Sequence, residues 1–303
     1  MCKQKFYTLI DGSGFIFRAF YAVKANMALP DGTPTNAVYG YCSMLLKLIE
    51  EKLRNNIPDE QEIISVIFDS ARKNFRNDIY PEYKANRGDI PLELIPQFSL
   101  IRQATAAFGL PVIELNMYEA DDIIATYVRQ ISAQNDACRI VSSDKDLMQL
   151  IDDDKNIFIY DAMKDKNLYA CDAMKKFSVL PHQIPDVQAL IGDTSDNIPG
   201  VLGIGPKGAA DLINEFQNIE NMYDNIDCVK SEKHRVMLTA NKENALISKR
   251  LATLKNDIDM HINICDFSPT IIDFDSLIDF CKSMNFPSIV NRVLKLKNLQ
   301  SIK

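Results

Sequence analysis

The sequence lacks long apolar runs and the spacings that mark zinc sites or disulfide frameworks. Although 47% of its 303 residues are hydrophobic, no run approaches the roughly 20 apolar residues of a membrane span. The short apolar run before Asp11 is also unlike a signal peptide. The seven cysteines are never spaced as CxxC, and the three histidines form no HExxH pattern. These absences argue against a membrane protein, a secreted disulfide-bonded protein and a zinc hydrolase, and they favour a reducing cytoplasm.

The chain also lacks the net positive charge that nucleic-acid-binding domains usually carry, since its formal charge is −7. Basic residues nevertheless concentrate in two segments. Residues 72–87 hold five Lys or Arg against two acids, and residues 230–255 hold seven against two. Composition alone is typical of solvated charged surfaces. The first segment, however, directly follows an acidic motif, which favours a role in binding.

Short apolar runs alternate with helical patterns in the first half of the chain. Runs at 6–10, 62–68 and 138–142 are rich in β-branched and aromatic residues, as buried parallel strands are. Helical patterns lie between and around them, at 37–53, 93–109 and 119–134. This order predicts an α/β fold with a central, mainly parallel sheet flanked by helices. After a predicted hairpin at 157–170 the pattern is almost wholly helical, so we predict an α/β domain at 1–170 and a helical region at 171–303.

Acidic residues gather where the predicted strands end. Three strands run into Asp11, Asp69 and Asp144. The motifs YEADD, SSDKD and GDTSDNIPG add Glu119, Asp121, Asp122, Asp146, Asp193 and Asp196. The i, i+3 spacing of the last two predicts one face of a helical turn. Each motif alone has an ordinary interpretation as a turn, a helix cap or an acidic first helical turn.

Together, the nine carboxylates indicate a metal site. Functional groups in parallel α/β sheets gather beyond the carboxyl ends of the strands. Two carboxylates about 4 Å apart repel by about 4 kcal/mol at intermediate dielectric, so such a cluster requires cations. Oxygen ligands without His or Cys favour Mg²⁺ or Mn²⁺ over zinc.

Seven motifs occur in order between about residues 6 and 258, and with them the chain resembles the 5′-3′ exonuclease domain of bacterial DNA polymerase I. The motifs are LIDGSGFIFRAFYA, TNAVYGYCSMLLKLI, VIFDSARKNFRNDIYPEYKANR, YEADDIIAT, SSDKDLMQL, IGDTSDNIPGVLGIGPKGA and LATLKNDI. Phage and eukaryotic flap endonucleases are related. The resemblance implies a PIN-like 5′-nuclease fold with two metal clusters. The first would hold Asp11, Asp69, Glu119, Asp121 and Asp122, and the second Asp144, Asp146, Asp193 and Asp196.

The resemblance also implies roles for the basic segment. In the family the stretch matching residues 72–92 forms a helical arch that admits a 5′ single strand. Lys84 and Arg87 would stabilise the reacting phosphate, with Arg76 as a helper, and Lys73 would bind the strand. Tyr21 and Tyr83 are candidates for stacking on bases, although Tyr21 fits the core equally well.

A glycine pattern in the helical half has two interpretations. Gly203, Gly205 and Gly208 match the dinucleotide fingerprint, but no strand precedes them, so neither a nicotinamide nor a flavin cofactor is expected. A helix-hairpin-helix at about 190–215 fits better. Its turn amides and Lys207 would face a DNA phosphate, and the resemblance adds a monovalent cation there. An ordinary helix–helix turn remains the alternative.

We therefore expect a structure-specific 5′-3′ exonuclease or flap endonuclease that uses two or more Mg²⁺ ions, with Mn²⁺ as a substitute. Its expected partners are DNA with a 5′ flap, nick or 5′ end, and RNA–DNA hybrids. A monomer in the bacterial cytoplasm, at the nucleoid, is expected. A non-cutting module for branched DNA and a PIN-type ribonuclease are the alternatives. Both a stand-alone nuclease and a piece of a longer polymerase fit the sequence.

Overall fold

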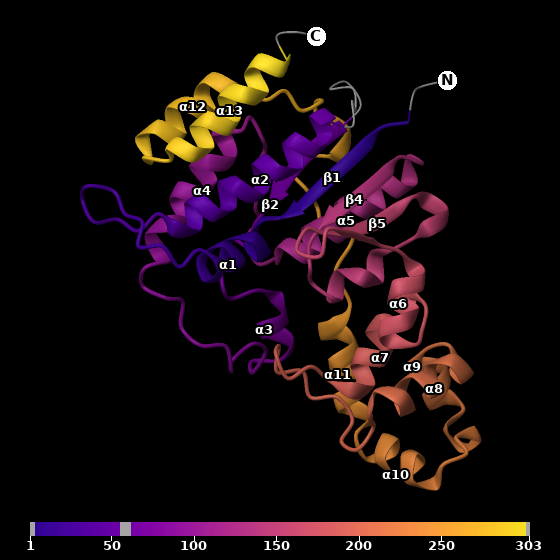
Figure 1. Cartoon of the computed structure of the whole chain (residues 1–303). Coiled ribbons are helices and arrows are strands. Elements are labelled where there is room, and N and C mark those ends of the chain that lie inside the picture. The colour runs from indigo at the N-terminus through magenta and orange to yellow at the C-terminus, as the bar shows by residue number, and fades with distance from the viewer. Residues whose placement is uncertain (1–3, 55–61, 301–303) are drawn as a thin grey trace.

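A six-stranded sheet lies at the centre of the computed structural model, which describes residues 4–54 and 62–300 (Figure 1). The strand order is β3-β2-β1-β4-β5-β6. The strands are β1 (Phe6–Asp11), β2 (Glu62–Ile67), β3 (Val112–Ile113), β4 (Ala137–Val141), β5 (Ile157–Asp161) and β6 (Lys166–Leu168). All neighbours pair in parallel except β5 and β6, which form the predicted hairpin. The α/β prediction is confirmed.

Some helices cover this sheet, and others, among them α8, α9 and α10, lie away from it (Figure 1). The helices are α1 (Gly12–Ala22), α2 (Asn36–Arg54), α3 (Phe75–Ile79), α4 (Ile95–Ala107), α5 (Ala120–Ala133), α6 (Ala170–Phe177), α7 (Ile184–Ile191), α8 (Pro206–Phe216), α9 (Ile219–Asp224), α10 (Glu232–Ala240), α11 (Lys242–Ala252), α12 (Phe274–Ser283) and α13 (Pro287–Gln300). Helices α2, α4 and α5 were predicted within two residues at each end. No helix among residues 4–54 and 62–300 has the length and apolarity to cross a membrane.

Alternate residues of the central strands build two hydrophobic cores, one on each face of the sheet, because side chains in a strand point to opposite faces. Leu9 of β1 joins the core that contains α5, whereas its neighbour Ile10 joins the core that contains α1, α2 and α4. In β2, Ile63 and Ile64 divide in the same way. The strands are therefore buried on both faces, which explains why their sequences are continuously apolar.

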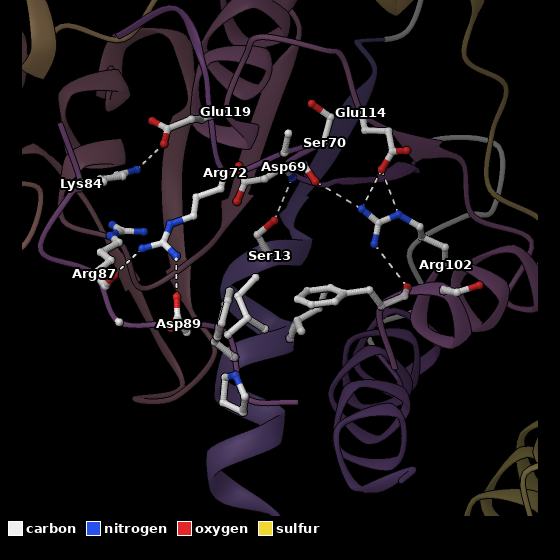
Figure 2. Close-up of a pocket in the computed structure, with 18 of the residues that line it drawn as sticks. Ser13, Asp69, Ser70, Arg72, Lys84, Arg87, Asp89, Arg102, Glu114 and Glu119 are labelled. Atoms are coloured by element: carbon white, nitrogen blue, oxygen red, sulfur yellow. Dashed lines mark hydrogen bonds and ion pairs between the residues drawn. The ribbon is translucent and has the colours of Figure 1, made fainter. Parts of the chain in front are cut away.

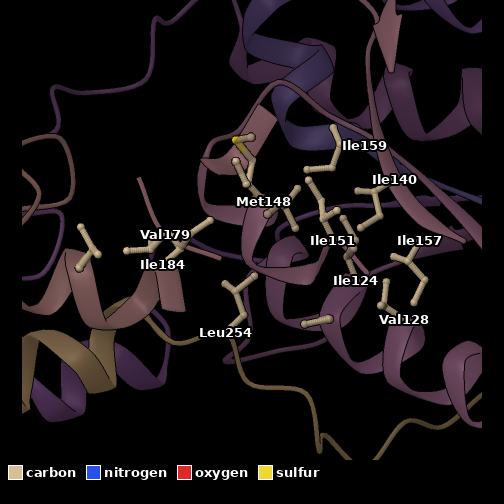
Figure 3. Packing of buried hydrophobic residues seen from close by; sticks show 14 of the residues in the cluster. Ile124, Val128, Ile140, Met148, Ile151, Ile157, Ile159, Val179, Ile184 and Leu254 are labelled. Atoms are coloured by element: carbon tan, nitrogen blue, oxygen red, sulfur yellow. The ribbon is translucent and has the colours of Figure 1, made fainter. Parts of the chain in front are cut away.

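The core on the α5 face continues into the helical half of the chain. Figure 3 shows strand residues Ile140 and Ile159 packed with Ile124 of α5, and further along the same cluster Ile184 of α7 and Leu254. Each such side chain contributes about 1.5–3 kcal/mol through burial. Helices α7 and α8 are therefore held on the same core as the sheet, close to the strand ends where the acids lie.

The last two helices return to the other face of the sheet. Helices α12 and α13 pack beside α2 and α4, where Leu277 and Ile289 join the core with Leu45 and Ile101 (Figure 1). The predicted region 171–303 is thus divided in space between the two faces. The boundary predicted at residue 170 falls between β6 and α6 and stays a prediction. The outermost residues of the predicted ranges, 1–3 and 301–303, lie outside the described residues.

Candidate metal centre and nucleic-acid interface

Asp11 is the last residue of β1 and also caps helix α1. The sequence analysis did not predict this helix. Its Oδ1 accepts a 2.8 Å hydrogen bond from the Gly14 amide, as N-cap residues do. A Cβ atom at Gly14 would lie 2.4 Å from this carboxylate, so a glycine is needed for the helix to approach. Ser142, just beyond β4, donates to Oδ2 at 2.8 Å. Asp11 is thereby fixed at the carboxyl edge of the sheet.

Asp69 connects β2 to helices α1 and α5. Its Oδ1 accepts a hydrogen bond from the Ala120 amide at 2.7 Å, and its own amide donates to Ser13 Oγ at 2.8 Å. Helix α5 begins there, with Glu119 as its N-cap and Asp121 and Asp122 in its first turn. Acids are favoured at this position because the helix dipole places partial positive charge at the N-terminus. The YEADD motif is thus directed toward Asp69 and Asp11.

The remaining acids follow β4 and α7. Asp144 accepts a bond from the Asp146 amide at 2.9 Å, and Asp146 accepts one from Gln188 of α7. Asp193 and Ile198 exchange two backbone hydrogen bonds of 3.0 and 2.8 Å, which closes a tight loop that carries Asp196. The prediction of a helical turn at 193–196 is therefore wrong, because antiparallel backbone pairing shapes this loop instead.

Four cations pair with part of this acidic cluster. Arg76 binds Asp122 through two hydrogen bonds of 2.7 Å. Lys84 contacts Glu119 and lies 3.6 Å from Asp196, to which Arg87 also donates at 2.6 Å. Lys145 pairs with Asp193, and together with Ser195 it lowers the pKa of that carboxyl against the opposing effect of burial.

The other acids of the cluster form no ion pairs with described residues. Within the described ranges, no ion pair involves Asp11, Asp69, Asp121, Asp144 or Asp146. Burial, with the charges of Asp69 and Asp144, raises the pKa of Asp11 to about 6. Burial and Asp144 raise the pKa of Asp146 to about 6 as well. Burial and the charges of Asp144 and Asp11 raise the pKa of Asp121 well above its usual value.

This donor set fits hard divalent cations. It offers only oxygen ligands, and several carboxylates line a cleft of about 80 Å³: Glu119, Asp121, Asp144, Asp146 and Asp196. As the side chains stand, no three acids of the described residues converge tightly enough to share one ion. The fit therefore rests on donor chemistry and excess negative charge, which Mg²⁺ or Mn²⁺ would neutralise.

The segment predicted as a helical arch is folded onto the acidic loop. Its one helix in the described structure, α3, has five residues, and turns follow it. The Lys84 amide donates to the Asp196 carbonyl at 3.0 Å. Asn86 donates to the Thr194 carbonyl and Asn197 to the Glu82 carbonyl, both at 2.6 Å. These bonds attach residues 82–87 directly to the loop that carries two of the acids.

Two predicted DNA-contacting residues are buried instead. Arg76 is 1% exposed and also donates from Nε to the Leu251 carbonyl at 2.8 Å, so its guanidinium cannot reach a phosphate. Tyr83 is 4% exposed, and its hydroxyl donates to Glu119 at 3.0 Å and lies 3.3 Å from Asp196. Its ring is therefore not available for stacking. Tyr21, by contrast, is 65% exposed, which excludes the core interpretation, and Lys73 lies on the surface.

The glycine pattern lies in a turn between helices α7 and α8. Gly203 adopts φ +88°, a conformation that side chains disfavour. Val201 and Ile204 are buried and anchor the turn, whereas Gly205 and Lys207 are exposed. Gly205 is the N-cap of α8 and provides no side-chain cap, so the first amides of that helix have no intrahelical partner. Gly208 packs against the ring of His234 on α10.

Two family matches cover most of the chain. Residues 6–178 match the N-terminal resolvase-like domain of 5′-3′ exonucleases, and residues 179–275 match their C-terminal SAM fold. The chain belongs to the 5′-3′ exonuclease family. Known relatives agree with this assignment. The 5′-3′ exonuclease of Aquifex aeolicus is 33% identical over 95% of both chains.

Other relatives of this chain are longer or more distant. DNA polymerase I of Rhizobium leguminosarum is 44% identical over 97% of the chain, which spans 29% of that protein's length. Among solved structures, bacteriophage T5 5′-exonuclease with bound zinc ions is 20% identical, with a TM-score of 0.64 over 96% of this chain and 99% of the other. The catalytic core of Rad2 with DNA substrate is 17% identical, with a TM-score of 0.63 over 97% and 92%. These two likenesses show the same fold.

The sequence analysis missed three residues that orient the acids. Lys145 stands between Asp144 and Asp146 in SSDKD, so its place within the motif was a usable signal. Ser142 begins the same motif and bonds to Asp11. Gln188 carried no signal, because its contact with Asp146 depends on how α7 packs.

Proposed function

We propose that this chain is a Mg²⁺-dependent 5′-nuclease that hydrolyses phosphodiester bonds at 5′ ends, nicks or flaps of duplex DNA. The observation that carries the proposal is the group of carboxylates at the sheet edge that have no ion-pair partner among the described residues. A protein that only binds DNA would gain nothing from buried acids that repel both one another and the phosphate backbone. RNA primers on DNA are included in the proposed substrates, which fits roles in Okazaki-fragment processing and DNA repair.

The metal would be held by the carboxylates at the sheet edge. They are Asp11, Asp69, Glu119, Asp121, Asp144, Asp146, Asp193 and Asp196. When bound, divalent cations lower the pKa of the attacking water and stabilise charge on the phosphate and the leaving oxygen. The serine and backbone hydrogen bonds to Asp11 and Asp69 keep these carboxylates in place, as supporting residues do in metal sites. Monovalent cation binding at the hairpin belongs to the proposal as well.

Three residues of the site, Arg76, Asp122 and Tyr83, act by positioning others. The bidentate bond from Arg76 fixes Asp122, and with it the first turn of α5 from which Glu119 and Asp121 project. We therefore assign Arg76 and Asp122 a structural role rather than contact with the phosphate or direct metal binding. Tyr83 similarly orients Glu119 through its hydroxyl.

Lys84 and Arg87 are the cations proposed to contact the scissile phosphate. The Arg87 side chain is 52% exposed and the Lys84 side chain 15%. Burial works against the charged form of Lys84, but Glu119 and Asp196 raise its pKa, so the side chain stays protonated. Both can donate charge-assisted hydrogen bonds to phosphate oxygens next to the acids.

Duplex DNA is proposed to bind at the exposed turn before α8. The amides of the exposed residues Gly203 and Gly205 and the Lys207 ammonium suit a backbone phosphate and carry no sequence preference. The basic residues of 230–255 would extend this grip. Figure 1 shows α8 far from α4, so duplex bound there would approach the acids from the helical side.

The decisive experiment is cleavage of a 5′-labelled flap duplex with Mg²⁺, with EDTA, and by Asp69→Asn. We expect cutting near the junction with Mg²⁺ and its loss in the other two cases. Asp154→Asn, which changes an exposed acid outside the cluster, is the matched control and should cut normally. Tight binding without cutting in any divalent metal would refute catalysis, and preferential cutting of single-stranded RNA would favour a ribonuclease.

A further inference from the structure

An apolar groove lies at the edge of the sheet opposite the metal centre. A cavity of about 840 Å³ adjoins the catalytic acids, with Asp69 and Glu119 in its lining, and belongs to the site already described (Figure 2). The groove, of about 580 Å³, lies instead between α5, the loop before β5 and residues 180–182. It reaches Ile157, where β5 begins, and Ser132, about 18 Å along α5 from its first residue. Since β5, β4 and β1 run parallel, this is the amino edge of the sheet.

The floor of this groove is apolar. Val128 and Ile151 line it and belong to the core shown in Figure 3. Leu150, also in the lining, is half-buried. Leu180 lines the groove as well and is 43% exposed, although the next residue, Pro181, is buried. A large apolar side chain left exposed in a hollow with an apolar floor marks a surface that another molecule can cover.

A short acidic loop, residues 152–154, contributes three carboxylates to the lining. Asp152 and Ile157 exchange two backbone hydrogen bonds of 3.0 and 2.9 Å, which close this loop at the start of β5. The Asp153 carboxylate accepts a hydrogen bond of 3.1 Å from the Ala170 amide, which ties the loop to the start of α6. The acids are therefore held at the groove before any partner binds.

This loop gives the groove an acidic character. Among the described residues that line it, Arg129 is the one Lys or Arg, against the three aspartates. Lys155 lies 3.8 Å from Asp152 but does not belong to the lining. Asp154 forms no ion pair within the described part of the chain. Such a surface repels the phosphates of DNA and attracts lysine and arginine side chains.

We propose that this groove binds a peptide segment of a partner protein in which an apolar side chain is flanked by lysine or arginine. The apolar side chain packs on Leu150 and Leu180, and its cationic neighbours pair with residues 152–154. Small ligands bury most of their surface in concave pockets. Here Asp153 and His182 are exposed and leave the groove open, as a groove that receives a peptide is. The inference does not depend on the proposed function, because the groove lies away from the edge where DNA would react.

The test measures the fluorescence anisotropy of short labelled peptides. The first carries a leucine between lysines, the second has serine in place of the leucine, and the third has glutamates in place of the lysines. We expect the wild-type protein to bind the first about 10- to 100-fold more tightly than the second, as burial of one leucine implies. The third should not bind. Failure of the first peptide to bind at about 1 mM would overturn the inference.

Two double variants with the same change of charge test the acidic loop. Asp152→Asn combined with Asp153→Asn should weaken binding of the first peptide about 3- to 10-fold, as the loss of two exposed ion pairs does. Asparagine at position 153 can still accept the Ala170 hydrogen bond, so the loop should keep its shape. Asp224→Asn combined with Asp227→Asn removes two exposed acids near the end of α9 and should bind as wild type. Equal weakening in both would show attraction by net charge alone and would overturn the inference.

Two further measurements distinguish this peptide from other occupants. With benzoylphenylalanine in place of the leucine, photocrosslinking and mass spectrometry should label Leu150, Leu180 or their neighbours, and labels confined to other surfaces would overturn the inference. Duplex DNA in Ca²⁺ should not displace the peptide. Displacement would assign the groove to the DNA interface instead. Self-association of the protein that Asp152→Asn with Asp153→Asn abolishes would assign it to a second copy of the chain.

Discussion

Arg76 and Asp122 form a fully buried bidentate ion pair, with Nη1–Oδ2 and Nη2–Oδ1 distances of 2.7 Å. Their side chains are 1% and 0% exposed. The remaining donors of Arg76 reach the carbonyls of Leu251 and Thr253, and the Lys255 amide donates to Asp122. This pair joins the basic segment, the start of α5 and the end of α11 behind the metal centre, so the geometry of the acids depends on it.

Asp122→Asn should strongly destabilise the protein, because it leaves the Arg76 guanidinium buried without its counter-charge. Breaking a buried pair by removing one partner typically costs about 3–5 kcal/mol. Urea unfolding in EDTA measures this loss. The exposed pair between Glu232 and Arg235 provides the control, since Glu232→Gln should cost less than about 1 kcal/mol. Equal losses of unfolding free energy in the two variants would show that the buried pair contributes no more to stability than the exposed pair.

Asp121→Asn, one residue earlier, should have the opposite effect on the metal-free protein. Among the described residues no hydrogen-bond donor reaches the Asp121 carboxylate, and burial and neighbouring acids disfavour its charge. Removing that charge should raise Tm in EDTA by about 2 °C, since about 1 kcal/mol shifts Tm by roughly 2–4 °C in domains of 150–250 residues and by less in longer chains. It should also reduce the rise in Tm on adding Mg²⁺ and abolish cutting. Thermal unfolding with and without Mg²⁺ measures both, and a lower Tm in EDTA would contradict the prediction.

The parts of the site that follow from local sequence were predictable. A strand that ends on Asp11 or runs into Asp69 places its carboxylate at the sheet edge whatever the rest of the chain does. The first turn of α5 likewise directs Glu119 and Asp121 together. The sheet, the hairpin and three helices could be derived in the same way, since hydrophobic periodicity is a local signal.

The parts that depend on distant contacts were not predictable. The basic run around Arg76 is typical of an exposed surface. Arg76 is buried because it packs against a segment far along the chain, where it donates to the Leu251 carbonyl, 175 residues away. Tyr83 is drawn inward by Glu119 and Asp196 in the same manner. The return of α12 and α13 to the first helices also depends on long-range packing, which no sequence period encodes.

Lys84→Met should lower kcat for flap cutting about 10²-fold while KM changes little, because a cation next to the reacting phosphate stabilises charge that develops in the transition state. Single-turnover cutting at saturating protein isolates this step. Lys282→Met, on the remote helix α12 and largely exposed, is the control and should leave the rate unchanged. A raised KM with an unaltered kcat would instead assign Lys84 to ground-state binding of the strand.

Lys207→Gln and Lys73→Gln should separate duplex binding from single-strand binding. Lys207 is exposed at the turn before α8, where duplex is proposed to bind, whereas Lys73 is exposed in the basic segment that follows Asp69, where the single strand is proposed to bind. Loss of one phosphate contact should reduce the slope of log K against log salt by about 0.9 for duplex and about 0.7 for a single strand. Lys207→Gln should therefore reduce the salt slope for both blunt duplex and flap. Lys73→Gln should reduce the slope for the flap alone. Measurements in Ca²⁺ over a range of salt concentrations decide this. If both variants flattened the blunt-duplex slope, Lys73 would contact the duplex and not the single strand alone.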